Sequence, residues 1–466
     1  MANDRYDLLV VGSGPGGQQA AIQAAKLDKR VGLIERKPYL GGVSLQTGTI
    51  PSKALREAAF LASRFAAQGM REAFPRRPGM GSDFLSDAVQ KKDTVVEKSE
   101  SILLGKLLAA GVTIIPGEAG FHDPHTLRIA GISGKTEYLS ADVVVLATGS
   151  RPRRPADVPF DKERVLDSTS ILRMRRLPAS LLVIGGGVIA CEFATIFAPL
   201  GVGVTVVDSH EQLLAYLDED IAGNLMENML DMGITLHLRA RVKAIHREGE
   251  RVKLLTDVDE LHEADALLYA MGRQPNFDRL NLDRAGLVAD DRGWVRVDEH
   301  FRTPVPHIYV VGDLVGRPSL ASTAMEQGRL VANIAFGKKS APSPAPLPMA
   351  IYTIPELSYA GETERELAQR EADYVAGKAG YGATARGQII GDYRGTLKLL
   401  ADRATRRLLG VHIIGEGASE LVHVGQMLMG CNGTVDMLAA NVFNYPTLAE
   451  CYKTAALDCI DQLGEA

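Results

Sequence analysis

Residues 6–26 read YDLLVVGSGPGGQQAAIQAAK, an apolar run, a glycine-rich turn and an alanine-rich segment in direct succession. The apolar run has the length of a buried strand, and the alanine-rich segment favours a helix. A second apolar run, Val31 to Ile34, ends in the acid Glu35. The stretch therefore predicts a strand, a tight turn, a helix and a second strand, the repeating unit of a parallel α/β sheet.

The glycines of this turn have separate tasks in a phosphate-binding loop. Gly12 permits the tight turn, Gly14 lets the backbone approach a pyrophosphate, and Gly17 lets the helix pack closely. The helix N-terminus offers unpaired N–H groups to phosphates, while Glu35 is placed to accept hydrogen bonds from ribose hydroxyls. A single copy of the motif is weak evidence, because a turn that only packs a helix on a sheet can look the same.

The same pattern returns in the middle of the chain. An apolar run at residues 180–184 precedes Gly185, Gly187 and Ala190 at the three turn positions, and the following strand ends in Asp208. The interval from the first glycine to the acid is identical in the two copies, 12 to 35 and 185 to 208. Two copies with matching acids argue against a purely structural turn and predict two nucleotide-binding folds.

Composition describes an ordinary globular protein. The chain has 466 residues, 46% apolar and 23% charged, which implies roughly two to four domains. A net charge of -5 gives no reason to expect nucleic acid, whose footprint is a basic stripe. We expect no membrane segment, because the apolar runs are strand-sized and the first residues lack the pattern of a signal peptide. A cytoplasmic protein is predicted.

The cysteines show no paired motif. Cys191, Cys431, Cys451 and Cys459 form no Cys-x-x-Cys pair and lie in helix-like contexts. We expect all four to be reduced thiols in the core of a cytosolic protein. No residue is assigned to a metal.

Punctuation residues suggest where the chain changes domain. The prolines of residues 151–155, RPRRP, mark the point where the chain leaves the first nucleotide-binding fold. Residues 54–115 read mostly as long amphipathic helices with a break at residues 75–79, PRRPG. Residues 340–348, with four prolines, read as a linker. Beyond the linker we expect strands at 395–400 and 408–414 and a helix at 418–429.

The segment 41–53, GGVSLQTGTIPSK, carries a resemblance to a known family. It resembles the part of pyridine nucleotide-disulfide reductases that holds two redox cysteines, but Ser44 and Thr49 stand at those positions. A thiolate is needed to pass electrons to a disulfide, because the exchange runs through a mixed disulfide. The resemblance therefore implies a flavin and a nicotinamide without disulfide chemistry, and a disulfide reductase is nearly excluded.

The resemblance covers essentially the whole chain. Within the family, the chain is most similar to the soluble, FAD-containing pyridine nucleotide transhydrogenases. This similarity rests on GTIPSKAL at 48–55, IYTIPE at 351–356 and FNYPT at 443–447, followed by Glu450. Tyr445 stands where disulfide reductases have their acid-base histidine. One departure is Ser44, since these relatives usually keep the first cysteine. The resemblance implies two Rossmann-like three-layer α/β nucleotide-binding domains and an α+β C-terminal dimerisation domain, arranged as in glutathione reductase.

The family pattern also implies a domain division. Residues 143–150, VVVLATGS, and residues 303–313, TPVPHIYVVGD, resemble two FAD motifs, although a plain strand and turn would also explain the second. The FAD domain would then be interrupted by the second nucleotide domain. The expected parts are 1–150 (FAD, with a helical excursion at 54–115), 151–270 (NAD(P)), 271–340 (FAD, second part) and 349–466 (dimerisation).

The mechanism implied by the resemblance is a ping-pong hydride relay between NAD(H) and NADP(H) through bound FAD in a homodimer. The resemblance implies four catalytic residues. Lys53 and Glu192 match the family's ion pair beside the flavin. Tyr445 stands at the position that faces the flavin of the partner subunit, and Glu450 stands where the family has the glutamate that orients the histidine. Plainer interpretations stay open. Lys53 could be a surface lysine that opens a helix, and Glu192 could be a first-turn acid favoured by the helix dipole. Tyr445 and Glu450 could be merely structural. The expected cofactor-binding residues are Gly12, Gly14, Gly17, Glu35, Lys53, Thr148, Gly149, Gly185, Gly187, Ala190, Asp208, Gly272 and Asp313.

Asp208 creates a conflict within this interpretation. An acid there suits the 2'-hydroxyl of NAD and repels the 2'-phosphate of NADP. Use of both nucleotides would require His210, Arg239 or Arg241 to approach in space. Two alternatives therefore remain: an NAD(P)H dehydrogenase or diaphorase that reduces a quinone, a dye or oxygen, and a non-catalytic flavin-binding protein.

Overall fold

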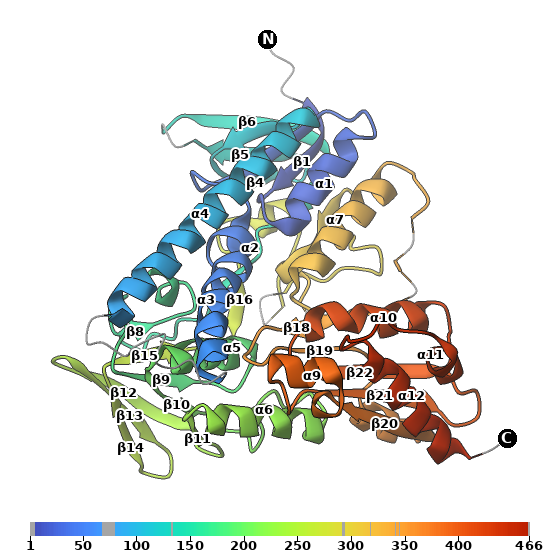
Figure 1. The fold of residues 1–466 in the computed structure, drawn as a ribbon. Coiled ribbons are helices and arrows are strands. Elements are labelled where there is room, and N and C mark those ends of the chain that lie inside the picture. Colours follow the sequence, from blue (N-terminus) through green and yellow to red (C-terminus); the bar gives the residue numbers. More distant parts are fainter. Residues whose placement is uncertain are drawn as a thin grey trace. The chain divides into compact units, whose positions relative to one another are not determined.

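The computed structural model describes residues 5–67, 80–131, 134–290, 294–316, 318–340, 342–343 and 345–464. The chain folds into two compact units, and Figure 1 shows it coloured along the sequence. Unit 1 comprises Met1–Ala54, Val89–Arg153 and Gly272–Pro342, and unit 2 comprises Leu55–Ala88, Arg154–Met271 and Ser343–Ala466.

Unit 1 is built on a seven-stranded sheet with the strand order β3-β2-β1-β6-β5-β4 and with β17 beside β6. The pairs β3–β2, β2–β1, β1–β6 and β6–β17 are parallel. The pairs β6–β5 and β5–β4 are antiparallel. The strands are β1 (Arg5–Val11), β2 (Val31–Glu35), β3 (Thr113–Pro116), β4 (Glu118–Asp123), β5 (Thr126–Ala130), β6 (Thr136–Leu146) and β17 (Ile308–Val310).

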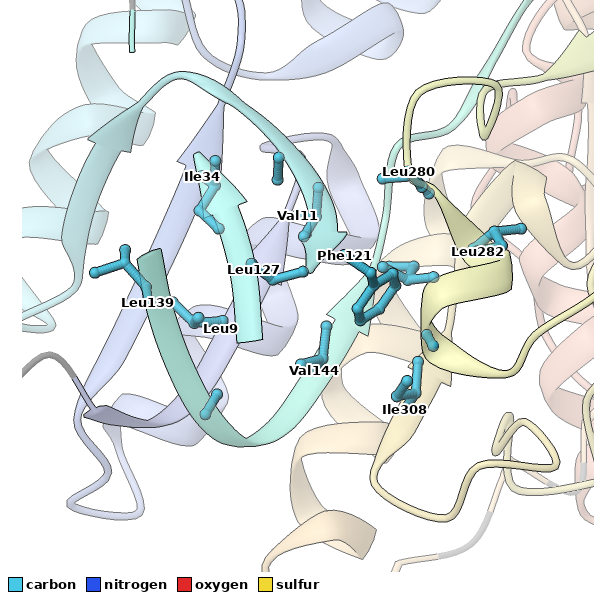
Figure 2. Close-up of a cluster of buried hydrophobic side chains, with 14 of the residues drawn as sticks. Leu9, Val11, Ile34, Phe121, Leu127, Leu139, Val144, Leu280, Leu282 and Ile308 are labelled. Atoms are coloured by element: carbon cyan, nitrogen blue, oxygen red, sulfur yellow. The ribbon is translucent and has the colours of Figure 1, made fainter. Parts of the chain in front are cut away.

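The apolar run of β1 is continuous because both faces of the sheet are covered. Leu9 and Val11 point into one buried cluster, and Leu8 and Val10 point into another. Figure 2 shows the first of these clusters, in which the Phe121 side chain packs among residues of several strands. Alternation along β1 therefore builds two cores, one on each face.

Helix α1 (Pro15–Ala25) begins where proline fixes the backbone angle of the first helical residue. A Cβ atom added to Gly17 would lie 1.9 Å from the carbonyl oxygen of Gly12. A Cβ atom on Gly328, in α7 (Ala321–Ala335), would lie 2.1 Å from the carbonyl oxygen of Gly16. The absence of side chains at these glycines therefore allows α1 to lie directly against its own turn and against α7.

Three further helices follow β2 in the chain: α2 (Gly42–Gln46), α3 (Thr49–Ala67) and α4 (Met80–Ala109). The helical excursion predicted at 54–115 is wrong at its end, because residues from Thr113 form β3 and pair in parallel with β2. The β-branched residues of this segment favour a strand, which the helical pattern of the preceding residues concealed. The predicted break at residues 75–79 lies outside the described residues.

Unit 2 contains a second parallel sheet, with the strand order β11-β10-β9-β15-β8. An antiparallel meander, β12-β13-β14, packs on it through Ile245, Val252 and Leu254, which share a core with Leu182 and Val207. The elements are β8 (Val165–Leu166), β9 (Ser180–Ile184), α5 (Val188–Phe197), β10 (Gly203–Val207), α6 (Glu219–Asp231), β11 (Thr235–His237), β12 (Val242–Glu248), β13 (Arg251–Thr256), β14 (Leu261–Ala264) and β15 (Ala266–Tyr269).

The C-terminal part of unit 2 is an antiparallel sheet with the order β18-β19-β22-β21-β20. The two predicted strands and the helix beyond the linker are confirmed as β21, β22 and α10. The elements are β18 (Met349–Ile351), β19 (Leu357–Gly361), α8 (Glu364–Gln369), β20 (Tyr374–Gly380), α9 (Ala385–Ile390), β21 (Thr396–Asp402), β22 (Leu408–Ile414), α10 (Ala418–Gly430), α11 (Val435–Ala440) and α12 (Glu450–Leu463).

A buried lysine joins this C-terminal sheet to the second nucleotide-type fold. The side chain of Lys398, on β21, is 0% exposed. Its Nζ lies 2.7 Å from Asp218 and 2.7 Å from Asp220 at the start of α6, and 3.2 Å from Glu364 at the start of α8. A buried cation requires partners of opposite charge, so these carboxylates hold α6 and α8 on β21.

The predicted fold class is confirmed: two Rossmann-like α/β folds and an α+β C-terminal part. The domain boundaries stay a prediction. Among the described helices, none combines the length and the apolar character that crossing a bilayer requires.

Candidate functional site

The first glycine turn is closed where it packs and open where a ligand would approach. Gly12 has a φ of +104°, and a Cβ there would lie 2.5 Å from the carbonyl oxygen of Ala147. A Cβ on Gly14 would meet only that same oxygen, at 3.8 Å. Only glycine fits at the first position, whereas the backbone at the second remains accessible.

Helix α1 begins at this turn without a side-chain cap. The first N–H groups of any helix have no intrahelical acceptor, and the helix dipole adds partial positive charge there. An uncapped N-terminus next to an accessible glycine backbone is suited to a pyrophosphate.

Glu35 ends β2 beside the turn and is buried. Its Oε2 accepts hydrogen bonds from the Ser13 backbone N–H (3.1 Å) and the Ser13 hydroxyl (2.7 Å). Its Oε1 accepts from the Lys37 backbone N–H at 2.9 Å. A carboxylate offers about four acceptor positions, so Glu35 is oriented by its neighbours and still able to accept ribose hydroxyls.

The second part of the predicted flavin site is assembled within the same unit. The Thr148 hydroxyl donates to the Asn276 carbonyl at 2.6 Å, and the Asn276 side chain donates back to the Thr148 carbonyl at 3.0 Å. Gly149, at a φ of +65°, has open space where a Cβ would stand. Gly272, at a φ of +90°, likewise has open space there, and its carbonyl accepts from the Arg153 backbone N–H at 3.1 Å.

Asp313 follows β17, which lies parallel to β6. The Ser150 hydroxyl donates to Asp313 and accepts a hydrogen bond from Arg273 Nε at 2.8 Å. Residues 148–149 and 313 thus follow the carboxyl ends of two neighbouring parallel strands, where α/β sheets bind ligands. The open glycines, the uncapped helix and the oriented carboxylates fit a flavin dinucleotide.

The second glycine turn follows β9. Gly185 has a φ of +108° and donates its N–H to the Val207 carbonyl at 2.9 Å. A Cβ on Gly187 would meet nothing within 4 Å, while Ala190 is fully buried in α5. Helix α5 also begins without a side-chain cap. This turn therefore has the same phosphate-binding features as the first.

The acid of the second fold has a different neighbour. Oδ1 of the buried Asp208 accepts the His210 backbone N–H at 2.8 Å and lies 2.7 Å from His210 Nδ1. The His210 side chain is 67% exposed. Arg239 donates its backbone N–H to the His210 carbonyl at 3.0 Å, and its guanidinium pairs with Glu211 at 2.7 Å. Arg241 donates its backbone N–H to Asp257 at 2.8 Å.

Lys53 and Glu192 lie in different units, and their pairing stays a prediction. Lys53 is half-buried on α3, with Nζ 3.4 Å from the Ser52 hydroxyl. Glu192 is buried on α5, where Oε1 accepts the Tyr352 backbone N–H at 2.9 Å. The alternative interpretation of Glu192 as a first-turn acid is wrong, because α5 has no acid in its first turn.

Tyr445 and Glu450 lie near the start of α12. The Tyr445 side chain is exposed, and Oε2 of Glu450 accepts the Thr447 backbone N–H at 3.3 Å. Glu450 therefore orders the turn that precedes its own helix. Their roles toward a flavin stay predictions.

All four cysteines are free thiols. Cys191, Cys451 and Cys459 are buried as predicted, and burial raises the pKa of Cys451 to about 12 and that of Cys459 to about 11. The prediction is wrong for Cys431, which is exposed. Cys431 directly follows the last residue of α10, outside the segment that the helix buries.

Three residues of these sites were missed in the sequence: Ser13, Ser150 and Arg273. Ser13 orients Glu35, and Arg273 reaches Asp313 through the Ser150 hydroxyl. Each is adjacent in sequence to a predicted glycine, which was the only available signal. Their partners, 22 to 163 residues away, could not be read from the sequence.

Comparison with known proteins agrees with this architecture. The family model described as pyridine nucleotide-disulphide oxidoreductase matches residues 6–328, and the model of its dimerisation domain matches residues 347–456. The chain is 42% identical over 460 residues to the soluble pyridine nucleotide transhydrogenase of Mycobacterium tuberculosis, covering 98% of both chains. It is 39% identical to the enzyme of that name from Azotobacter vinelandii, covering 99% of this chain and 100% of the other.

Solved structures are similar over the same length. The HOCl-induced flavoprotein disulfide reductase RclA from Escherichia coli matches with a TM-score of 0.87 and 27% identity, over 97% of this chain and 99% of that chain. LpdA from Mycobacterium tuberculosis matches with a TM-score of 0.89 and 27% identity over the same shares. With both family models and full-length relatives in agreement, the chain belongs to the pyridine nucleotide-disulphide oxidoreductase family.

Proposed function

We propose that this protein is a FAD-dependent transhydrogenase that transfers hydride between NAD(H) and NADP(H). The observation that carries the proposal is the 38–42% identity, over nearly the whole chain, to relatives named soluble pyridine nucleotide transhydrogenase. Bound flavin would supply the hydride chemistry, and the protein would supply binding and orientation. Those relatives are named as soluble enzymes, and we infer a cytoplasmic location.

The first glycine turn is proposed to hold the flavin dinucleotide. Gly12, Gly14 and Gly17 would bring the backbone and the α1 N-terminus to the pyrophosphate, and Glu35 would accept from the adenosine ribose. Thr148, Gly149, Gly272 and Asp313 would line the remainder. The Ser150–Arg273 chain of hydrogen bonds would keep the Asp313 carboxylate oriented toward the ribityl hydroxyls.

The second turn is proposed to hold the nicotinamide nucleotide. Gly185, Gly187 and Ala190 would cradle its pyrophosphate, and Asp208 would bind the ribose of NAD. His210 Nδ1 lies 2.7 Å from Asp208 Oδ1. In its doubly protonated form the imidazole would donate Nδ1–H to this carboxylate and Nε2–H to a 2'-phosphate. Tolerance of both nucleotides at one site would follow.

Lys53 and Glu192 are proposed to form an ion pair that places a cation beside the flavin. Glu192 also accepts from Tyr352, and the Thr195 hydroxyl accepts the Ile354 backbone N–H at 3.1 Å. Helix α5 thereby positions the segment 351–354. The dimerisation domain supports a homodimer, in which Tyr445 and Glu450 would approach the flavin of the partner chain.

The decisive experiment mixes the oxidised holoenzyme anaerobically with NADH and, separately, with NADPH in a stopped-flow instrument. We expect both to bleach the flavin, and we expect the reduced enzyme to be reoxidised by either oxidised nucleotide. Reduction by one nucleotide alone, with rapid reoxidation by a quinone or oxygen, would instead support the dehydrogenase alternative.

A dithionite titration tests the absence of disulfide chemistry. Neither Ser44 nor Thr49 can store electrons, so reduction should end at two electrons per FAD, without a long-wavelength thiolate band. The Ser44→Cys variant is the matched control and should still reduce no disulfide, because residue 49 offers no second thiol. Uptake of four electrons by the wild type would contradict the proposal.

A further inference from the structure

Two histidines and a glutamate meet at the edge of the second nucleotide-type fold. His237 is the last residue of β11, His262 lies within β14, and Glu260 immediately precedes β14. One ligand-type atom from each residue lies within 4.8 Å of the other two. Figure 1 labels both strands. The residues are too widely and irregularly spaced to form a recognisable sequence motif.

The separations of these atoms suit coordination better than hydrogen bonding. Oε2 of Glu260 lies 3.5 Å from His237 Nδ1 and 3.5 Å from His262 Nε2. A good N–H···O hydrogen bond spans about 2.7–3.2 Å. Ligands of a tetrahedral ion with bonds of about 2.0–2.1 Å stand about 3.4 Å apart. The centroids of the two imidazole rings are 4.3 Å apart with an interplanar angle of 63°, and the ligand-type atoms of all three residues lie within 4.8 Å of one another.

One of these nitrogens is buried without a hydrogen-bond partner. Nε2 of His262 makes no well-formed hydrogen bond among the described residues, and its contact with the Glu260 carboxylate is 3.5 Å long. An unsatisfied buried polar atom costs about 1–3 kcal/mol, so it calls for an explanation. An ion bound at this point would supply the missing partner.

The donor atoms of the cluster also suit a cation. Imidazole binds metals in its neutral form, and a carboxylate supplies the negative charge. The Glu260 backbone is fixed, because its N–H donates to the Thr256 hydroxyl at 3.1 Å and its carbonyl accepts the Thr256 N–H at 3.0 Å. The carboxylate is therefore carried by an ordered turn.

We propose that His237, Glu260 and His262 form a binding site for a divalent transition-metal ion of the zinc class. Nδ1 of His237, Oε2 of Glu260 and Nε2 of His262 would be the protein ligands, and water would complete the coordination. Two imidazoles select such an ion over Mg²⁺ or Ca²⁺, which prefer oxygen ligands.

The site has a defined place relative to the proposed nucleotide acid. The carbonyl of His237 accepts the backbone N–H of Asp208 at 3.0 Å. A bound ion would therefore tie the end of β11, and with it the strand end that carries Asp208, to the start of β14. Metal binding is separate from the hydride chemistry and can be measured without it.

The test is a titration of untagged, chelator-stripped holoenzyme with Co²⁺, followed by displacement with Zn²⁺. We expect one Co²⁺ per chain with visible d–d absorption, and loss of this absorption when Zn²⁺ is added. Glu260→Gln should weaken binding at least about tenfold, and His262→Ala should abolish it. His246→Ala, which removes an exposed histidine of the neighbouring β12, should leave binding unchanged.

Folding is checked in every variant by its FAD absorbance and circular dichroism. Glu260 is half-exposed, so its glutamine variant should fold even if the alanine variant of His262 does not. Zinc K-edge absorption of the loaded protein should show two imidazoles. Equal Co²⁺ affinity in wild type and Glu260→Gln, or equal binding of Mg²⁺ and Zn²⁺ at this site, would overturn the proposal.

Discussion

The two glycine turns have the same spacing but differ in how tightly the protein encloses them. In the first turn, a Cβ atom would lie 2.5 Å from its nearest neighbour at Gly12, 2.9 Å at Gly16 and 1.9 Å at Gly17. In the second, the distance is 3.1 Å at Gly185 and 2.9 Å at Gly186, where the nearest atom is the end of the Leu213 side chain. Gly187 has open space, and Ala190 already carries a Cβ. A shared motif therefore does not imply a shared environment. The tight turn suits a resident cofactor, and the looser one suits a substrate that must leave.

The two acids differ in the same sense. Glu35 is oriented by backbone N–H groups and a serine hydroxyl, which are neutral donors that stay the same at any working pH. Asp208 is oriented partly by the imidazole of His210, whose exposed side chain can change its position. The first fold thus presents a fixed acceptor, and the second an adjustable one.

The largest difference is expected from adding side chains to the two turns. Gly17→Val should yield no folded holoenzyme, because the clash is with the backbone carbonyl of Gly12, which cannot move aside. Gly187→Ala, at the position of the second turn that corresponds to Gly14, is the contrasting variant, because a Cβ there meets nothing within 4 Å. We expect normal FAD content and less than about 1 kcal/mol of lost stability. FAD absorbance per chain and thermal unfolding measure both. Equal FAD content in the two variants would remove the contrast.

We expect the stability of the second fold to depend on a buried charge, and that of the first fold to depend on close packing at its glycines. Lys398→Met leaves the buried carboxylate of Asp218 and the partly exposed carboxylates of Asp220 and Glu364 without their cation. We expect a loss of about 3–5 kcal/mol, mostly from the uncompensated charge of Asp218. Lys378→Met is the control: Lys378 pairs with Asp220 at 2.8 Å but is 48% exposed, so its loss should cost at most about 1 kcal/mol. Denaturant unfolding of both variants gives the two values, and similar losses would contradict a dominant role for Lys398.

Acid should weaken this same cluster. Burial raises the pKa of Asp220, but hydrogen bonds from Lys378 and Lys398 outweigh it, and the pKa ends below its ordinary 3.8. A carboxylate with a lowered pKa in the folded state stabilises the fold above its unfolded pKa, and this stabilisation is lost as the pH falls through the folded value. The difference in stability between wild type and Asp220→Asn should therefore stay constant from pH 6 down to the ordinary pKa of 3.8 and shrink below it. A difference that persists unchanged at still lower pH would argue against the ion pairs.

Replacing His210 should separate the two nicotinamide substrates. If its imidazole compensates Asp208 and donates to a 2'-phosphate, His210→Ala should raise the KM for NADPH about tenfold, as expected for the loss of one charge-assisted hydrogen bond. The KM for NADH should stay within about twofold by the same reasoning. His246→Ala, at an exposed histidine away from Asp208, is the control. Parallel changes for both nucleotides would assign His210 a structural role only.

The smallest effect is expected at the cysteines. In the native protein only the exposed Cys431 should react with an aromatic disulfide reagent, because burial keeps the other three thiols protonated and inaccessible. Denaturation should raise the count from one to four per chain. Cys431→Ser should remove the native reaction and leave transhydrogenation unchanged. A second fast thiol in the native protein would reopen the question of an alternative redox pair.

Local patterns were enough to predict the scaffold. Strands β1, β2, β9 and β10, both glycine turns and the C-terminal strands follow from short apolar runs and glycine spacing, which depend only on near neighbours in the chain. Predictions failed where the same local pattern is compatible with two structures, such as a helix or a strand, or a buried or an exposed side chain. Residues 113–115 continued a helical region yet joined the sheet, and Cys431 followed an apolar helix yet lies exposed.

The sequence by itself determined the two nucleotide folds, their acids and the lack of thiols at residues 44 and 49. Only the tertiary structure decided which groups surround those residues: His210 beside Asp208, Tyr352 on Glu192, three carboxylates around Lys398, and the meeting of His237, Glu260 and His262. Most of these contacts join residues that the order of strands brings together from distant parts of the chain. A period-two or period-3.6 pattern specifies which face of an element is buried but carries no information about the element it meets, so such partners become visible only in the folded chain.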